Sequence, residues 1–193
     1  MSRVKTKRTP AAQVRRALFD AARVVLARDG VKGLTVRAVA AQAGVAPMGV
    51  YNHFDGKDGL LESVVADGFE RLRDEIRGVD TADPRVRLRE AGRRYRAFAL
   101  DNPTLYRLMF SGSCDVDMVG AEALVALTDL IRFGQATGVI RDEDPLSLTM
   151  QVWSCVHGAV SLELDSTAPD HELLDNEANY EALLGLIERG VRP

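Results

Sequence analysis

The sequence has no long apolar run and only two cysteines, and each shortage excludes a class of protein. No segment approaches the roughly 20 consecutive apolar residues that a membrane-spanning helix needs. We expect no secretory signal peptide, because the helix predicted after the basic start MSRVKTKRTP carries charged residues throughout. Cys114 and Cys155 lie far apart without metal-ligand spacing, which is typical of proteins from a reducing compartment. The sequence therefore predicts a cytoplasmic protein without a membrane segment or a disulfide framework.

The residue patterns of common catalytic and metal sites are also missing. His53, His157 and His171 show no ligand spacing with either cysteine. Cys155 and His157 are two positions apart on a predicted helix, so they point to different sides and cannot pair as nucleophile and base. The run SGS at 111–113 is too short for a phosphate-binding glycine loop. We expect no catalytic residue, no metal and no cofactor, and hence not an enzyme.

Charge is distributed unevenly along the 193 residues, although the net charge is only −3. Residues 1–57 contain 11 Lys and Arg against 3 Asp and Glu, whereas the remainder contains 14 against 25. A basic N-terminal part on an acidic body is the pattern expected of a nucleic-acid-binding domain attached to a second domain. Residues 1–9 form a basic arm that either contacts DNA phosphates or serves as a solubilising tail.

Apolar residues recur with helical spacing, and no strand pattern or internal repeat is present, so we predict an all-α fold of about nine helices. The first helix is expected over 10–28, broken by Gly30 and Gly33. Asp83 and Pro84 are expected to open another helix. We expect the arginines of that helix to form a solvated, salt-bridged face: Arg85, Arg87, Arg89, Arg93, Arg94 and Arg96.

The run TVRAVAAQAGVAPMGVYNHFDGKDGLL, residues 35–61, predicts two short helices joined by a tight turn. Thr35 is a good N-cap for the first helix, and Gly44 supplies a left-handed residue at its end. Pro47 suits the first turn of the second helix, because it has no N–H to leave unpaired there. This order of elements is the helix-turn-helix, whose second helix enters the major groove of DNA.

The letters GVAPMGVYNHFDGKDGLL resemble the signature of the tetracycline-repressor (TetR) family of one-component transcriptional regulators. Two departures are visible: Ala46 stands where the family usually has a Ser or Thr cap, and Met48 replaces a small residue. The resemblance implies an N-terminal three-helix DNA-binding domain and a larger helical-bundle C-terminal domain. It also implies that the following residues contact DNA: Thr35, Arg37, Pro47, Met48, Gly49, Tyr51, Asn52, His53 and Lys57.

Physical chemistry supports several of these roles. Lys57 at a helix N-terminus opposes the helix dipole, and a phosphate bound there would satisfy both the lysine and the free N–H groups. Met48 and Gly49 cannot form bidentate bonds to bases, so contact with thymine methyl groups or close backbone approach is expected instead. Asn52 could pair with adenine.

The run PLSLTMQVWSCVHGAVSLEL, residues 145–164, is apolar almost all round, which predicts a helix buried on more than one side. With the upstream NPTLYRLMF, its Trp153, His157 and Gly158 resemble the TetR subgroup known for a Trp-His-Gly motif. That resemblance implies an apolar effector pocket, although the same aromatic residues could simply form the core. The candidates are Tyr95, Phe98, Leu105, Tyr106, Met109, Phe110, Phe133, Trp153 and His157.

These expectations combine into a dimeric repressor, paired through its last two helices, that leaves a palindromic double-stranded operator when a small apolar effector binds. The alternatives are an effector-independent dimeric DNA-binding protein and a helical enzyme or carrier. The expected division is a flexible basic arm at 1–9, a DNA-binding domain at 10–56, a connecting helix at 57–78, and an effector-binding and dimerisation domain at 79–193.

Overall fold

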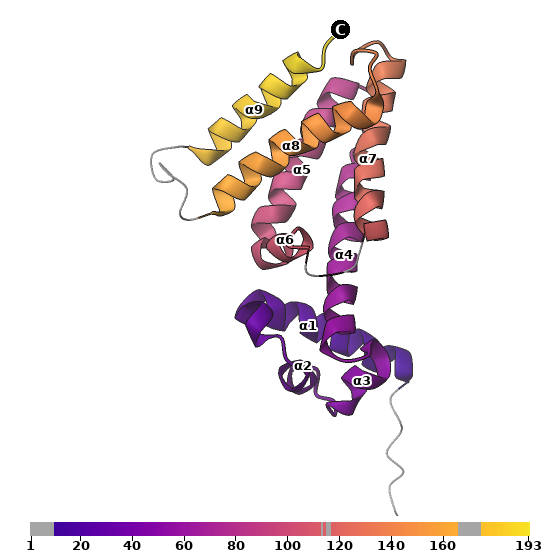
Figure 1. The fold of residues 1–193 in the computed structure, drawn as a ribbon, viewed down its shortest axis with the longest axis vertical. Coiled ribbons are helices and arrows are strands. Elements are labelled where there is room, and N and C mark those ends of the chain that lie inside the picture. The colour runs from indigo at the N-terminus through magenta and orange to yellow at the C-terminus, as the bar shows by residue number, and fades with distance from the viewer. Residues whose placement is uncertain (1–9, 113, 115–116, 166–174) are drawn as a thin grey trace, which may run out of the picture. The chain divides into compact units, whose positions relative to one another are not determined.

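A computed structural model describes residues 10–112, 114, 117–165 and 175–193, and these residues contain nine helices and no strand (Figure 1). The expected all-α fold is thereby confirmed for the described residues. The basic arm at 1–9 and His171 lie outside them. The helices are α1 (Ala11–Gly33), α2 (Val36–Ala43), α3 (Met48–Phe54), α4 (Lys57–Arg77), α5 (Pro84–Asp101), α6 (Pro103–Met109), α7 (Asp117–Ala136), α8 (Pro145–Leu164) and α9 (Asn176–Gly190).

The chain divides into two compact units, the first within residues 1–67 and 107–116 and the second within 68–106 and 117–193. Helices α4 and α6 each contribute residues to both units. The first unit contains α1, α2 and α3, and the second contains α5, α7, α8 and α9.

Local sequence signals determine the ends of α1 and α2. Helix α1 runs further than the expected 10–28, but Gly30 interrupts it with φ 68° and ψ −174°. Thr35 caps α2 by accepting a hydrogen bond from the Ala38 N–H at 3.1 Å. Gly44 ends α2 in the left-handed conformation, with φ 66° and ψ 30°. The two helices of the helix-turn-helix are therefore separated by the turn that the sequence predicts.

The turn between α3 and α4 places side chains at the end of the second helix of the motif. Asp55 and Gly56 both have positive φ, 55° and 98°. A Cβ at Gly56 would lie 3.5 Å from Cε1 of Tyr51, so the tyrosine ring packs directly over this glycine. Helix α4 then begins at Lys57, which keeps Tyr51 and Lys57 on either side of one tight turn.

In the second unit, α5 packs against α7, α8 and α9, and α8 also contacts α7 and α9 (Figure 1). Asp83 caps α5 through the Arg85 N–H, and Asp144 caps α8 through the Ser147 N–H. The hydrogen bonds from Ser147 lower the pKa of Asp144. At Gly92 an added Cβ would lie only 2.6 Å from Leu184, so this glycine lets α9 approach α5 closely.

Ion pairs join the arginines of α5 to neighbouring helices. Arg89 bonds Glu188 of α9 at 2.7 Å, and Arg93 forms two bonds with Glu181 of α9, at 2.6 and 2.8 Å. Arg96 forms two bonds with Glu163 of α8, at 2.7 and 2.6 Å. The salt-bridged character expected for this helix face is therefore correct for these three arginines.

Candidate nucleic-acid interface and ligand site

The short helix α3 has an inner face that packs on α1 and an outer face that is open. Val50 and Phe54 are buried, as expected for core residues. Met48 is 63% exposed and Tyr51 is 54% exposed, and Asn52 is also exposed. The outer face of α3 therefore presents a thioether, a phenol and a carboxamide, which can contact thymine methyl groups, phosphates and adenine.

Gly49 lies on the inner side of α3. A Cβ at this position would lie 3.4 Å from Cδ1 of Leu18 on α1, within ordinary contact distance. The structure thus separates Gly49 from Met48 and Asn52, which face outward. Pro47 is exposed just before α3, and His53 and Lys57 are half-buried.

The start of α2 adds two exposed polar side chains, Thr35 and Arg37. The Thr35 hydroxyl oxygen accepts the capping bond from Ala38, which leaves its O–H able to donate to a phosphate. By contrast α3 has no side-chain cap, consistent with Ala46 preceding it. Within this first turn the Gly49 and Val50 N–H groups instead donate to the backbone carbonyls of Ala46 and Pro47, at 2.9 and 3.1 Å.

Some of the basic residues of the first unit are already paired. Arg16 lies 3.8 Å from Asp20, Arg23 lies 3.9 Å from Asp67, and Arg28 lies 2.7 Å from Asp29. Arg37 and Lys57 have no ion pair within the described part of the chain. Those two cations are the ones that flank α3 in sequence, so charge is available where a DNA backbone would be contacted.

In the second unit the structure brings together four of the nine predicted pocket residues. The hydroxyls of Tyr95 and Tyr106 lie 3.0 Å apart, and each lies close to Nδ1 of His157, at 2.9 and 2.8 Å. The Trp153 ring lies beside His157, with ring centroids 5.0 Å apart. These side chains come from α5, α6 and α8 and form one hydrogen-bonded aromatic cluster.

Burial keeps this cluster uncharged near neutral pH. It raises the pKa of Tyr95 and of Tyr106, and it lowers the pKa of His157 below its usual 6.5. A neutral imidazole whose Nδ1 accepts from a tyrosine carries its proton on Nε2. The cluster can therefore donate or accept hydrogen bonds to a neutral polar group without carrying charge itself.

The remaining candidates lie elsewhere. Phe98 lies under the Arg71 guanidinium at 5.4 Å, and Phe133 lies under that of Arg87 at 5.0 Å. Leu105 is buried on α6 in the second unit. Met109 and Phe110 belong to the first unit.

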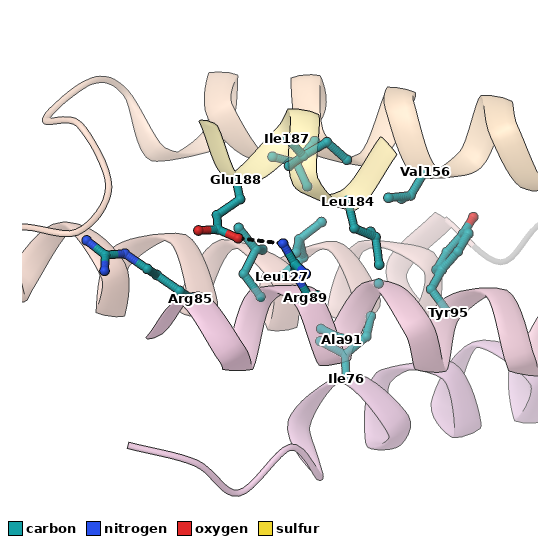
Figure 2. Close-up of a pocket in the computed structure, with 13 residues that line it drawn as sticks. Ile76, Arg85, Arg89, Ala91, Tyr95, Leu127, Val156, Leu184, Ile187 and Glu188 are labelled. Atoms are coloured by element: carbon teal, nitrogen blue, oxygen red, sulfur yellow. Dashed lines mark hydrogen bonds and ion pairs between the residues drawn. The ribbon is translucent and has the colours of Figure 1, made fainter. Parts of the chain in front are cut away.

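A narrow cavity of about 30 Å³ lies within the second unit, between α5 and α9 (Figure 2). Of the predicted pocket residues only Tyr95 lines it, at one end. Arg85 and the Arg89–Glu188 ion pair lie toward the opposite end. Most of the wall is apolar, including Ile76, Leu88, Leu127, Val156, Leu184 and Ile187.

Sequence reasoning missed the contribution of α9 to this cavity. The available signal was charge complementarity: Arg89 and Arg93 on one helix match Glu188 and Glu181 on another, in antiparallel order. That match would have placed α9 beside α5, and the apolar residues between the two glutamates would then line the space between the helices.

Metal-ligand clusters and membrane-spanning helices are both absent from the described residues. Across those ranges, no three or more His, Cys, Asp or Glu side chains are grouped so that they could hold a metal ion. Among the helices in that same part of the chain, none combines the length and apolar character of a membrane-spanning segment.

Comparison with known proteins gives matches over both units. The family model for bacterial regulatory proteins of the tetR family matches residues 18–64, and the model for tetracyclin repressor-like C-terminal domains matches residues 88–187. An uncharacterised helix-turn-helix-type transcriptional regulator of Mycobacterium tuberculosis is 26% identical, over 97% of this chain and 86% of its own length.

Solved structures share the fold. A protein of unknown function from Rhodococcus sp. RHA1 superposes with a TM-score of 0.82 and 23% identity, covering 100% of both chains. The TetR-family transcriptional regulator PfmR from Thermus thermophilus superposes with a TM-score of 0.67 and 21% identity, covering 92% of this chain and 100% of its own.

Proposed function

Because the chain belongs to the TetR family of transcriptional regulators, a family of DNA-binding proteins and not of enzymes, we propose that it is a homodimeric repressor released by a small effector. A regulator of this kind acts where the chromosome is, so we assign it to the cytoplasm. Its first unit would bind one half of a pseudo-palindromic operator. Its second unit would hold the dimer together and receive the effector.

The observation that carries the DNA-binding role is the division of α3 into a buried and an open face. Val50 and Phe54 hold the helix on the core, while Met48, Tyr51 and Asn52 project outward. In this proposal Met48 and Asn52 read base edges, through a thymine methyl group and an adenine. Phosphate contacts come from Thr35, Arg37, Tyr51, His53 and Lys57, while Pro47 and Gly49 allow the backbone at the start of α3 to approach the DNA closely.

Dimerisation through α8 and α9 is supported by the apolar residues that these helices leave exposed. Leu162 is 62% exposed and Leu186 is 58% exposed, and Leu146 and Met150 are exposed as well. The single charged residue of α8, Glu163, pairs with Arg96 of α5 and so leaves the outer side of α8 uncharged. Exposed apolar residues on two neighbouring helices suit an isologous four-helix interface.

The effector site is proposed around the cluster of Tyr95, Tyr106, Trp153 and His157. This cluster is apolar in bulk and carries a few convergent hydrogen-bonding groups, which is the usual composition of a ligand site. The position of Trp153 and His157 on one side of α8, followed by Gly158, also supports a place in the Trp-His-Gly subgroup. Effector binding would shift the spacing of the two DNA-binding units and weaken their fit to the half-sites.

Footprinting of the purified protein on the DNA upstream of its own coding region tests the proposal. We expect two protected half-sites, about 34–36 Å or a multiple of that distance apart, related by pseudo-twofold symmetry. Protection of one half-site alone, at protein concentrations where the protein is dimeric, would contradict the proposed symmetric mode of binding.

A further inference from the structure

The mouth of the α5–α9 cavity carries an excess of positive charge. Glu188 accepts hydrogen bonds from Arg89 through Oε2 and from Arg192 through Oε1, each at 2.7 Å. Arg85 lies at the same end, is exposed, and has no ion pair in the described ranges. A smaller cavity of about 10 Å³ shares this end and is also lined by Arg85, Glu188 and Arg192. Arg85, Arg89 and Arg192 thus surround the single carboxylate of Glu188. This local excess of positive charge is unusual in a part of the chain where acidic residues outnumber basic ones.

Behind this mouth the cavity is apolar. Leu88, Ala91, Val152 and Leu184 line it and are nearly inaccessible to solvent. The cavity follows α5 toward Tyr95, and the helical rise of 1.5 Å per residue places the Cα atoms of Arg85 and Tyr95 about 15 Å apart. Positive charge at one end of a long apolar slot is the complement of an anionic head group on a hydrocarbon tail.

We propose that this slot binds an amphipathic carboxylate, with its tail between α5 and α9 and its carboxylate on Arg85 and Arg89. This inference rests on the proposed function, because it names the chemical class of the effector, and it places that effector in the slot, which meets the aromatic cluster only at Tyr95. A planar guanidinium matches a carboxylate with two parallel hydrogen bonds, so Arg89 can exchange the Glu188 carboxylate for that of the ligand. Glu188 keeps Arg192 as its partner. The Arg85 side chain, which points away from the Arg89–Glu188 pair (Figure 2), swings in from solvent to meet the ligand.

The slot has to widen when a tail enters. A volume of about 30 Å³ accommodates water but not a hydrocarbon chain. Leu184 and Ile187, both from α9, form one wall, and Leu184 already sits in the notch that Gly92 provides. Moving these side chains displaces α9 from α5. Because the outer side of α9 carries Leu186, the same displacement would alter the proposed dimer interface.

The test is direct binding to the purified full-length protein without DNA, by isothermal titration with dodecanoate, dodecanol and dodecylamine below their micelle-forming concentrations. We expect dodecanoate to bind at one site per chain, dodecanol to bind about tenfold more weakly, and dodecylamine to bind more weakly still. Equal affinity for the three compounds would overturn the assignment of the head group to the arginines.

Three variants locate the carboxylate. Arg85→Gln and Arg89→Gln should each weaken dodecanoate binding about three- to tenfold and leave dodecanol binding unchanged. Glu188→Gln should tighten dodecanoate binding several-fold, because the ligand no longer competes for Arg89. Arg132→Gln is the matched control, since it removes the same charge from an exposed site on α7 and should have no effect. Loss of dodecanoate affinity in Glu188→Gln would contradict the exchange at Arg89.

The experiments distinguish a wrong slot proposal from a wrong proposed function. Operator binding with no measurable affinity for any of the three compounds would overturn the slot proposal and leave the regulator intact. Dodecanoate binding that depends on Arg89 but does not lower operator affinity would support the slot and overturn its role as the effector site.

Discussion

Tyr95, Tyr106 and His157 meet in a triangle of hydrogen-bonding atoms in which every group is neutral. Each edge of the triangle is 3.0 Å or shorter. Neutral groups in such a network can exchange partners with a ligand at little electrostatic cost. The imidazole is the member whose charge changes most easily, so it makes the cluster sensitive to pH.

Acidification should therefore destabilise the protein through His157. Burial lowers the pKa of this imidazole below 6.5, so the unfolded chain takes up a proton at a higher pH than the folded chain does. The resulting stability is present above pH 6.5 and is lost as the pH falls below that value. We expect urea unfolding between pH 7.5 and 5.5 to show a larger loss for the wild type than for His157→Gln. The difference should stay below about 1 kcal/mol, because the ring is only half-buried. Equal losses would exclude His157 as the cause.

Tyr51 and Asn52 are neighbours on the open face of α3 and should give different mutant phenotypes. Tyr51→Phe removes a phosphate-bonding hydroxyl, so it should weaken binding to all operator variants alike. Asn52→Ala removes a base contact and should cost about 1–3 kcal/mol at one base pair per half-site, relaxing specificity there. Competition binding with single-base operator variants separates the two. A uniform loss in Asn52→Ala would assign Asn52 to the DNA backbone instead.

At the scale of helices, the turn between α3 and α4 determines where the phosphate-contacting groups lie. Gly56 has φ 98° and is covered by the Tyr51 ring. A side chain at this position is disfavoured by the backbone conformation, although its Cβ would meet the ring only at ordinary contact distance.

Gly56→Ala should therefore lower the free energy of unfolding by about 1–2 kcal/mol and weaken DNA binding as well. Gly190→Ala is a suitable control, because Gly190 is helical and a Cβ there would have no neighbour within 4 Å. Chemical denaturation of both variants provides the measurement. Equal stability of the two would show that the turn tolerates a side chain.

Helix ends that depend on hydrogen bonds between residues close in sequence were predictable from the sequence. Thr35, Gly44 and Asp83 cap or end helices through bonds to residues no more than four positions away, so composition and spacing were enough to place them. The position of Trp153 and His157 on one side of α8 follows from helical periodicity in the same way.

Contacts between distant segments were not predictable from periodicity. The hydrogen bond between His157 and Tyr95 depends on how α5 and α8 are rotated about their axes. A stripe of apolar residues defines that rotation only to within tens of degrees. The cavity depends on Leu184 facing Gly92 across 92 positions of chain. Phe98 and Phe133 fit the aromatic pattern equally well but pack under arginines instead.

At the scale of the whole molecule, the proposed repressor consists of two copies of the chain. A single chain leaves Leu162 and Leu186 exposed on neighbouring helices. Two DNA-binding units are also needed to read two half-sites, so oligomeric state and operator affinity should change together.

Leu162→Glu combined with Leu186→Glu should therefore convert the dimer into a monomer. Like charges buried at a twofold interface are costly, because each lies near its own copy in the partner. Val86→Glu is the matched control, since Val86 is 50% exposed on α5. Sedimentation equilibrium measures the change. A dimer of unaltered affinity in the double variant would place the interface on another surface.

The central claim, that the first unit binds operator DNA through α3 and its flanks, is tested most directly by the salt dependence of binding. Operator affinity is titrated over a range of salt concentrations for the wild type, Lys57→Ala and the distant control Arg132→Ala. We expect Lys57→Ala to weaken binding to every sequence and to reduce the slope of log K against log salt by about one unit per bound subunit. The control should keep the wild-type slope. An unchanged slope in Lys57→Ala, or equal affinity of the wild type for operator and unrelated DNA, would contradict the account.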